Sequence, residues 1–230
     1  MTTIRTVATH DVVQTLFPRP VTEQDEIGMA VGKAIDDALS RFSHEYRSGR
    51  RPTLTAMDRY SAEGLDRELS ESGLSLPPET RSHHLAEIGG VLRAFRGSEL
   101  MGLSRPRSRL ILIGGELGIY AQPDYWDGRA RFYEMKSYRA DPIPPDVRLQ
   151  LRLFQLAFPE CRAFLAGFDR HARPVTVAIT ELASLPPEER LALLREAAQV
   201  AREKGTPKVL EYVDNPTVRY DLTSAAGSPS

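Results

Sequence analysis

The chain has 230 residues, of which 41% are hydrophobic and 27% are charged, and its formal net charge is −1. This composition is ordinary for a globular protein, and the charge balance excludes a uniformly basic nucleic-acid coat. No apolar run approaches the ~20 residues of a membrane span, and the first residues lack the pattern of a secretory signal. We therefore expect a cytoplasmic protein without membrane contact. The single cysteine, Cys161, excludes an intrachain disulfide and a four-cysteine zinc or iron–sulfur site.

The first part of the chain predicts a helical extension. We expect residues 1–78 to form an N-terminal arm, with one short strand, followed by helices. Thr22 begins the first helix with Asp25 at capping-box spacing, and Thr53 caps the second. Apolar residues at helical spacing place these helices, and a third one, at residues 22–48, 53–70 and 79–95.

A β-hairpin is predicted in the middle of the chain, after a buried strand at 109–113. Its strands, 117–125 and 130–138, flank the turn residues Asp127 and Gly128. Because strand side chains alternate, Phe132, Glu134 and Lys136 share one face.

Whether Asp124 lies on that face depends on the register. It does so only if paired positions sum to an even number, as with a three-residue loop at 127–129 in which Gly128 has positive φ. A two-residue turn would place Asp124 on the opposite face unless a bulge intervenes. We expect the longer loop.

The remaining elements alternate between helix and strand. A proline-rich loop covers residues 138–145, and strand character returns near 212–222. The final Ala-Ala-Gly-Ser-Pro-Ser segment is expected to be disordered. Between these, helices are predicted at 146–158 and 186–204, and strands at 161–168 and 174–179.

Three short motifs resemble the PD-(D/E)xK nuclease superfamily, and within it the RecB-like and CRISPR-associated exonuclease branch. They are Pro123-Asp124, Glu134-Met135-Lys136 and a glutamine at Gln150 followed four positions later by Phe154, where the branch has tyrosine. The resemblance covers about residues 80–180. The chain departs from the branch in lacking iron–sulfur cysteines, and Gly32 stands where the first helix would carry histidine.

The resemblance implies an α/β fold with a restriction-endonuclease-like αβββαβ core and a mixed central sheet. This core and the last helix would span residues 79–205, followed by a partly disordered C-terminal tail at 206–230. The implied activity is a Mg²⁺- or Mn²⁺-dependent deoxyribonuclease acting through a metal-activated water. Asp124 and Glu134 would hold the metal, Lys136 would orient the water or stabilise charge, and Gln150 would support the site.

Several other residues are candidates for the same site. His84 and Glu87 lie one helical turn apart and could add to the metal ligands, and Glu116 is a further acid at the far end of the predicted hairpin. Tyr138, Arg129 and Arg131 could contact DNA, including single strands or DNA ends. A homo-oligomer remains possible. Two alternatives also stay open: a nucleic-acid-binding protein that does not cleave, and a partner-binding α/β protein.

Overall fold

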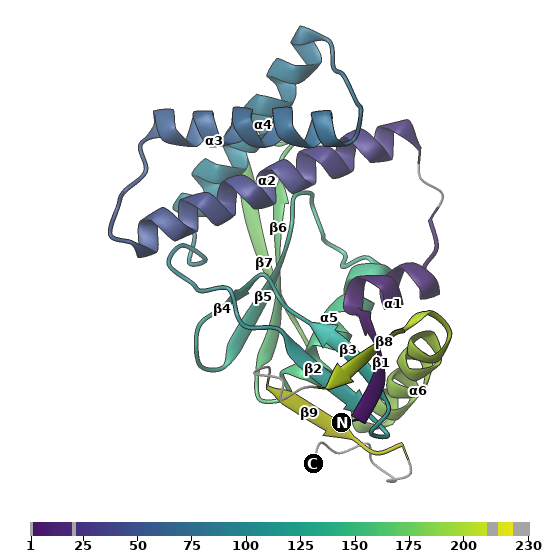
Figure 1. Cartoon of the computed structure of the whole chain (residues 1–230). Coiled ribbons are helices and arrows are strands. Elements are labelled where there is room, and N and C mark those ends of the chain that lie inside the picture. Colours follow the sequence, from purple (N-terminus) through teal and green to yellow (C-terminus); the bar gives the residue numbers. More distant parts are fainter. Residues whose placement is uncertain (1, 20–21, 211–215, 223–230) are drawn as a thin grey trace.

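The computed structural model describes residues 2–19, 22–210 and 216–222 of an α/β protein (Figure 1). Helices in these ranges are α1 (Thr9–Leu16), α2 (Glu23–Arg47), α3 (Leu54–Glu71), α4 (Pro78–Arg96), α5 (Pro145–Ala157) and α6 (Pro187–Lys204). Strands are β1 (Thr2–Ala8), β2 (Arg109–Ile113), β3 (Leu117–Ala121), β4 (Tyr125–Trp126), β5 (Arg131–Lys136), β6 (Arg162–Asp169), β7 (Thr176–Leu182), β8 (Thr206–Leu210) and β9 (Thr217–Tyr220). Among these helices, none combines the length and apolar character needed to cross a bilayer.

The described strands form two mixed sheets, where a single central sheet was predicted. A five-stranded sheet has the order β8-β1-β3-β2-β9, and a four-stranded sheet has the order β4-β5-β6-β7. The strand expected in the N-terminal arm is β1, which pairs with β3 and β8, and the strand character expected near 212–222 corresponds to β9, which pairs with β2. Strand β8 was not predicted. The predicted disordered end, residues 225–230, lies outside the described residues.

The predicted first hairpin strand is divided between the two sheets. Its N-terminal part is β3 and pairs with β2, whereas its C-terminal part is β4 and pairs with β5. The break comes at Gln122–Asp124, where Pro123 has no N–H to donate to a strand ladder. The Gln122 side chain instead bonds the carbonyl oxygen of Pro106 at 2.8 Å. The chain thus changes sheets immediately before Asp124.

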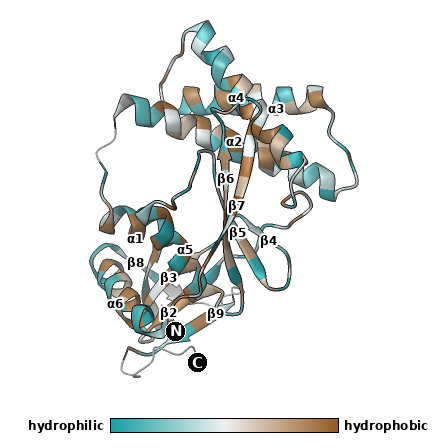
Figure 2. Ribbon diagram, turned by 180° about the vertical axis from the view of Figure 1, so that it is seen from behind, coloured by the Kyte–Doolittle hydropathy of each residue, from teal (hydrophilic) through white to brown (hydrophobic). Residues whose placement is uncertain are grey.

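Helices α2, α3 and α4 form a layer over one face of the four-stranded sheet (Figure 1). The predicted apolar stripe of α2 is buried there, and apolar colouring concentrates on the inner sides of these helices (Figure 2). Thr22 and Thr53 cap α2 and α3 as predicted, because their side chains accept the backbone N–H groups of Asp25 and Ala56. Helix α4, predicted to belong with the downstream core, packs against both α2 and α3.

The opposite face of the four-stranded sheet shares a second core with the five-stranded sheet. Helices α1, α5 and α6 contribute to this core. Phe132 of β5 meets Phe154 of α5 edge-on, with ring centroids 6.0 Å apart. Tyr133 and Met135, its neighbours along β5, point into the helical layer instead. Strand β5 therefore contributes alternately to two cores.

Gly167 of β6 lies directly under the loop that follows β5. A Cβ atom at this position would be 3.2 Å from both the Tyr138 carbonyl oxygen and the Ala140 nitrogen. These are backbone atoms, which cannot rotate away as a flexible side chain would. Glycine at this position therefore allows the loop after Lys136 to pack closely on β6.

A pair of valine substitutions would test the close crossing of α2 and α3. A Cβ at Gly64 would lie 3.2 Å from the Ala34 carbonyl oxygen, whereas a Cβ at Gly28 would meet nothing within 4 Å. We expect Gly64→Val to lower the free energy of unfolding by ~2 kcal/mol more than Gly28→Val, because valine overpacks the crossing. Urea denaturation measures the difference. Equal effects of the two substitutions would contradict the crossing.

Candidate functional site

The pairing of β4 with β5 places Asp124 opposite Glu134. Tyr125 pairs with Tyr133 and Trp126 with Phe132, so paired positions sum to an even number as predicted. The loop is centred one residue later than expected, because Asp127 also bonds Arg131 through its backbone. Gly128 has φ of 79°, as predicted.

The Asp127 side chain holds this loop. Its Oδ1 accepts the backbone N–H groups of Arg129, Ala130 and Arg131, and its Oδ2 pairs with the Arg131 guanidinium at 3.0 Å. Although burial opposes the effect, these hydrogen bonds lower the pKa of Asp127 to about 2. The turn that sets the register is therefore fixed by a carboxylate that stays ionised.

Lys136 joins the two acids to α5. Its Nζ donates to Glu134 Oε1 at 2.8 Å and to Gln150 Oε1 at 3.0 Å. Asp124 Oδ2 accepts the backbone N–H of Met135 at 2.8 Å, which holds its carboxylate beside β5. The sequence prediction that Asp124, Glu134, Lys136 and Gln150 converge therefore agrees with the arrangement of these side chains.

Glu134 retains its proton unusually strongly. Burial raises the pKa of Glu134 to about 8, the Asp124 carboxylate adds to the rise, and Lys136 opposes it. The two carboxyl groups are close enough to share a hydrogen bond when one is protonated. Burial lowers the pKa of Lys136, but attraction to Glu134 and Asp124 outweighs burial and leaves it raised. The Lys136 ammonium therefore stays charged beside a Glu134 carboxyl that binds its proton more tightly than usual.

This donor set suits a hard divalent cation. Mg²⁺ is commonly held by one or two carboxylates and several waters, and a cation would offset the repulsion from Asp124 that helps to raise the pKa of Glu134. Within the described residues, no group of three or more His, Cys, Asp or Glu side chains is spaced to hold a metal ion. The residues therefore fit an ion bound by two carboxylates and water, rather than one enclosed by protein ligands.

Asp36 of α2 is a further acid at this site that the sequence reasoning missed. Its pKa is raised to about 7 by burial and by repulsion from Asp124, while Lys136 and Arg105 oppose the rise. The side chain is nevertheless accessible to water, as expected for a group in a concave recess surrounded by protein. Solvent reaches Asp36, and the Asp124 carboxylate is the neighbouring charge that disfavours its ionised form. In the sequence, an acid that faces a site from an amphipathic helix looks the same as an acid on the solvated face of that helix.

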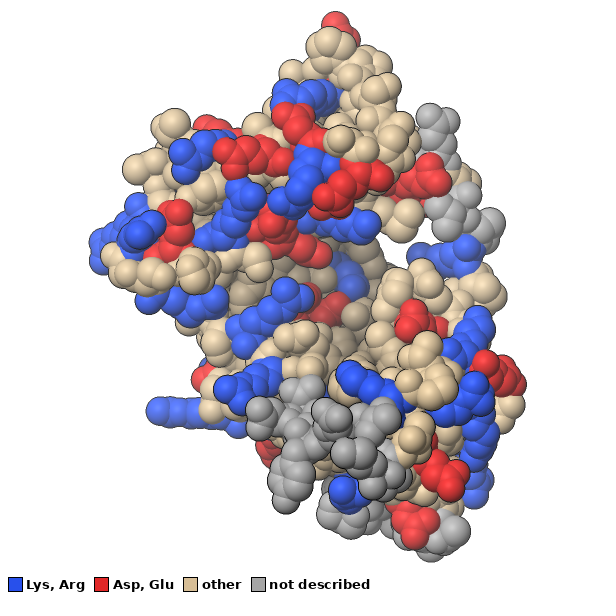
Figure 3. Space-filling model, in the orientation of Figure 1, with Lys and Arg blue, Asp and Glu red and all other residues tan. Residues whose placement is uncertain are grey.

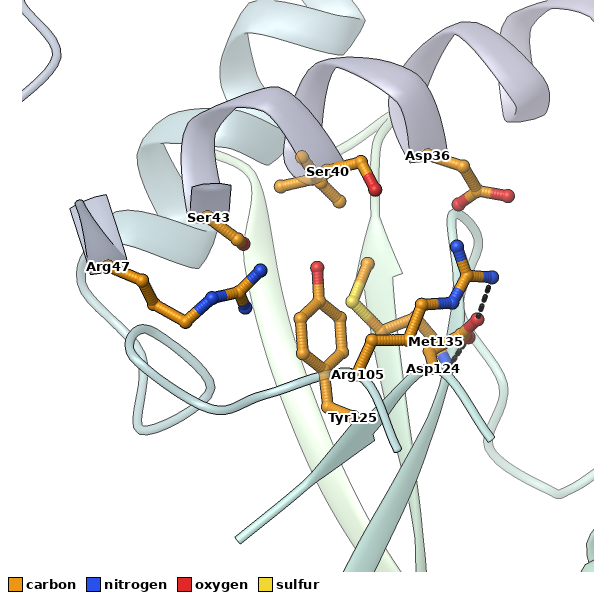
Figure 4. Close-up of a pocket in the computed structure, with 9 residues that line it drawn as sticks. Asp36, Ser40, Ser43, Arg47, Arg105, Asp124, Tyr125 and Met135 are labelled. Atoms are coloured by element: carbon orange, nitrogen blue, oxygen red, sulfur yellow. Dashed lines mark hydrogen bonds and ion pairs between the residues drawn. The ribbon is translucent and has the colours of Figure 1, made fainter. Parts of the chain in front are cut away.

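A small recess beneath α2 opens beside Asp124 (Figure 4). Residues Asp36, Ser40, Ser43 and Arg47 point into it from α2, opposite residues from the loop before β2 and from β4 and β5. Arg105 reaches between Asp36 and Asp124, with its Nη2 3.9 Å from Asp124 Oδ1. On the surface, acidic and basic side chains interleave over the helical layer (Figure 3).

The other predicted site residues are more dispersed. Tyr138 is near the cluster, since Lys136, Asp146 and Glu134 all affect its pKa, which burial raises. Arg131 begins β5, about 16 Å from Lys136 at ~3.3 Å per residue, and Arg129 lies in the turn before it. Glu116 lies in the turn between β2 and β3 of the other sheet. Of these residues, only Tyr138 is near the two acids.

His84 and Glu87 belong to a separate cluster. Glu87 is fully buried, and its carboxylate contacts His84 Nδ1 at 2.8 Å, His171 Nδ1 at 2.7 Å and His83 Nε2 at 3.2 Å. Burial would raise its pKa, but the hydrogen bond from His84 and the charges of Arg170 and His171 leave the pKa lowered. The structure does not bring this pair together with Asp124 and Glu134. The pair instead links α4 to the turn after β6.

Removing the Glu87 charge should destabilise the protein. We expect Glu87→Gln to lower the free energy of unfolding by ~2 kcal/mol, because an amide cannot accept hydrogen bonds from three imidazoles at two oxygens. The exposed Glu79 of the same helix provides the control, and Glu79→Gln should change stability by at most ~0.5 kcal/mol. Chemical denaturation at neutral pH compares the two. Equal stabilities would show that the histidine contacts contribute little.

Comparisons with known proteins assign no family. No family model matches the chain. A pre-mRNA-splicing factor of Saccharomyces cerevisiae, SPP382, is 27% identical over 158 residues, which are 66% of this chain and 22% of that protein. The chain thus spans about a fifth of the length of that relative. The crystal structure of SSO0001 aligns with 88% of this chain and 78% of the SSO0001 chain, at 15% sequence identity. The TM-score of 0.40 is too low to support a shared fold.

Proposed function

We propose that this protein is a divalent-metal-dependent nuclease that hydrolyses phosphodiester bonds in DNA. The observation that carries the proposal is the convergence of Asp124, Glu134 and Lys136, with Lys136 tied to Gln150 of α5. Bound between the two acids, a divalent ion would acidify a water ligand and neutralise charge developing on the phosphate. The sequence motifs at these same positions independently suggest this chemistry.

Each residue of the cluster has a distinct role in the proposed reaction. Asp124 is held against the Met135 N–H, so one carboxylate oxygen is oriented by the backbone of β5. Lys136 provides a half-buried point charge that can meet a non-bridging phosphate oxygen. Gln150 accepts one hydrogen bond from that ammonium and limits its movement. The amide nitrogen of Gln150 remains able to donate to water or phosphate.

RNA is the second substrate to be tested. The partly similar yeast protein is described as a pre-mRNA-splicing factor, which makes RNA a relevant comparison with DNA. In this proposal the residues described above contact the metal and the phosphate of the substrate. A phosphodiester is common to DNA and RNA. The choice between them therefore depends on the assay rather than on the cluster.

Single amide substitutions test the activity. Labelled DNA and RNA, single- and double-stranded, are incubated with Mg²⁺, Mn²⁺ or a chelator. We expect Asp124→Asn and Glu134→Gln to reduce cleavage by ~100-fold or more, because each removes a metal-binding charge. Glu116→Gln makes the same change on an acid of the other sheet and should retain activity within about twofold.

The outcomes separate three functions. Metal-dependent cleavage that is lost in both site variants and kept in Glu116→Gln supports a nuclease. Binding of nucleic acid without cleavage under any condition supports a non-cleaving binder. Neither binding nor cleavage supports a partner-binding protein and contradicts our proposal.

Metal binding should depend on pH because Glu134 must lose a proton. Its pKa of about 8 lies above the usual value for glutamate, so the carboxyl is mostly protonated at neutral pH. Below pH 8 we expect Mn²⁺ affinity to rise up to ~10-fold per pH unit, and to level off above it. Isothermal titration calorimetry at several pH values measures this. Glu134→Gln should flatten the profile, and a flat wild-type profile would exclude proton release from this acid.

A further inference from the structure

One face of α2 presents polar side chains to the recess beside Asp124. Asp36, Ser40, Ser43 and Arg47 follow one another at spacings of four, three and four residues, which places them along the same side of the helix. Figure 4 shows all four directed toward the recess. The face therefore offers a row of hydrogen-bonding groups that begins next to the acids and ends at a cation.

One buried hydroxyl in the recess, that of Ser43, lacks an ordinary partner. Ser43 is 3% exposed, and its Oγ makes no hydrogen bond within the described residues. The Tyr125 hydroxyl lies near enough to Ser43 to affect the pKa of the tyrosine, although the pair does not reach normal hydrogen-bond geometry. A buried hydroxyl without a partner carries a desolvation cost. An acceptor-rich ligand would remove that cost.

Two arginines flank these hydroxyls. Arg47 donates from Nη1 to the Leu103 carbonyl oxygen at 2.9 Å, and its guanidinium is directed into the recess (Figure 4). A guanidinium has five N–H donors, so the Leu103 contact leaves others available. Arg105 is exposed, and within the described part of the chain its one ion pair is the long contact with Asp124. The recess thus combines two guanidinium groups with a hydroxyl donor.

We infer that this recess is a subsite for a phosphate group of the substrate strand, adjacent to the phosphate that is cleaved. The inference rests on the proposed nuclease function. Arginine forks and hydroxyls are the groups that commonly bind phosphate oxygens, and Arg105 lies between Asp36 and Asp124, where it offsets the repulsion of those acids. The phosphate is either an internal one of a continuing strand or a terminal one. Both have the same chemistry at this position.

Binding without cleavage provides the test. Fluorescence anisotropy with labelled single-stranded DNA is measured in the presence of a chelator, which removes the divalent metal and so prevents the proposed cleavage. We expect Arg105→Gln and Arg47→Gln each to weaken binding by ~5- to 10-fold and to lower the salt dependence by about one phosphate contact. Arg107→Gln removes the same charge two residues from Arg105, outside the recess, and should change affinity by less than about twofold. Oligonucleotides with a 5′-phosphate, a 3′-phosphate or neither distinguish a terminal from an internal phosphate.

The controls keep the inference separate from the nuclease proposal. Arg47 also supports the Leu103 backbone, so thermal unfolding of each variant is compared with wild type; Arg105 makes no hydrogen bond among the described residues and provides the cleaner test. Loss of binding in Arg105→Gln alone supports the subsite even if no variant ever cleaves DNA. If Arg105→Gln and Arg107→Gln bind equally, or the wild type does not bind, the subsite is wrong, whether or not metal-dependent cleavage is found.

Discussion

The side chains of β5 alternate between two cores, and this alternation holds Glu134 and Lys136 beside α5. Phe132 anchors one face of the strand against Phe154, while Tyr133 and Met135 anchor the other face in the helical layer. A slip of one residue would exchange these faces and bury the charged pair among the helices. Burying that ion pair among apolar side chains, away from Gln150, would cost several kcal/mol in desolvation. The two hydrophobic cores therefore define the register, and the register positions the polar cluster.

Two buried glutamates show how neighbouring groups determine the behaviour of the same side chain. Glu134 is buried beside Asp124 and has a raised pKa, whereas Glu87 is fully buried and has a lowered one. Burial disfavours the charged form of both. Around Glu87, imidazoles and Arg170 outweigh burial, but around Glu134 a second acid reinforces it. The Glu87 carboxylate consequently suits a structural link, and the Glu134 carboxylate suits a site where a cation or a proton is exchanged.

Strand alternation was sufficient to place Glu134 and Lys136 on one face, and the choice of an even register added Asp124, whereas Gln150 was assigned to the site only through the family resemblance. They could not separate β3 from β4, since both halves have strand-forming residues and only Pro123 interrupts them. Asp36 lies about ninety residues before Asp124, and no local pattern connects a helix acid to a distant strand. His171, which contacts Glu87 across 84 positions, was missed for the same reason. Helices α2 to α6 were predicted closely because capping residues and apolar spacing are local properties, but the short α1 (Thr9–Leu16) was missed in the expected arm.

Gly167 of β6 determines how closely the segment that follows β5 can pack on the sheet. Its lack of a side chain lets the backbone at Tyr138 and Ala140, two and four residues beyond Lys136, rest on β6. Any larger residue would lift this segment and alter the direction in which the chain leaves the charged cluster. Among related sequences, position 167 should therefore remain glycine wherever the lysine at position 136 is retained. It should vary more in relatives that have lost that lysine.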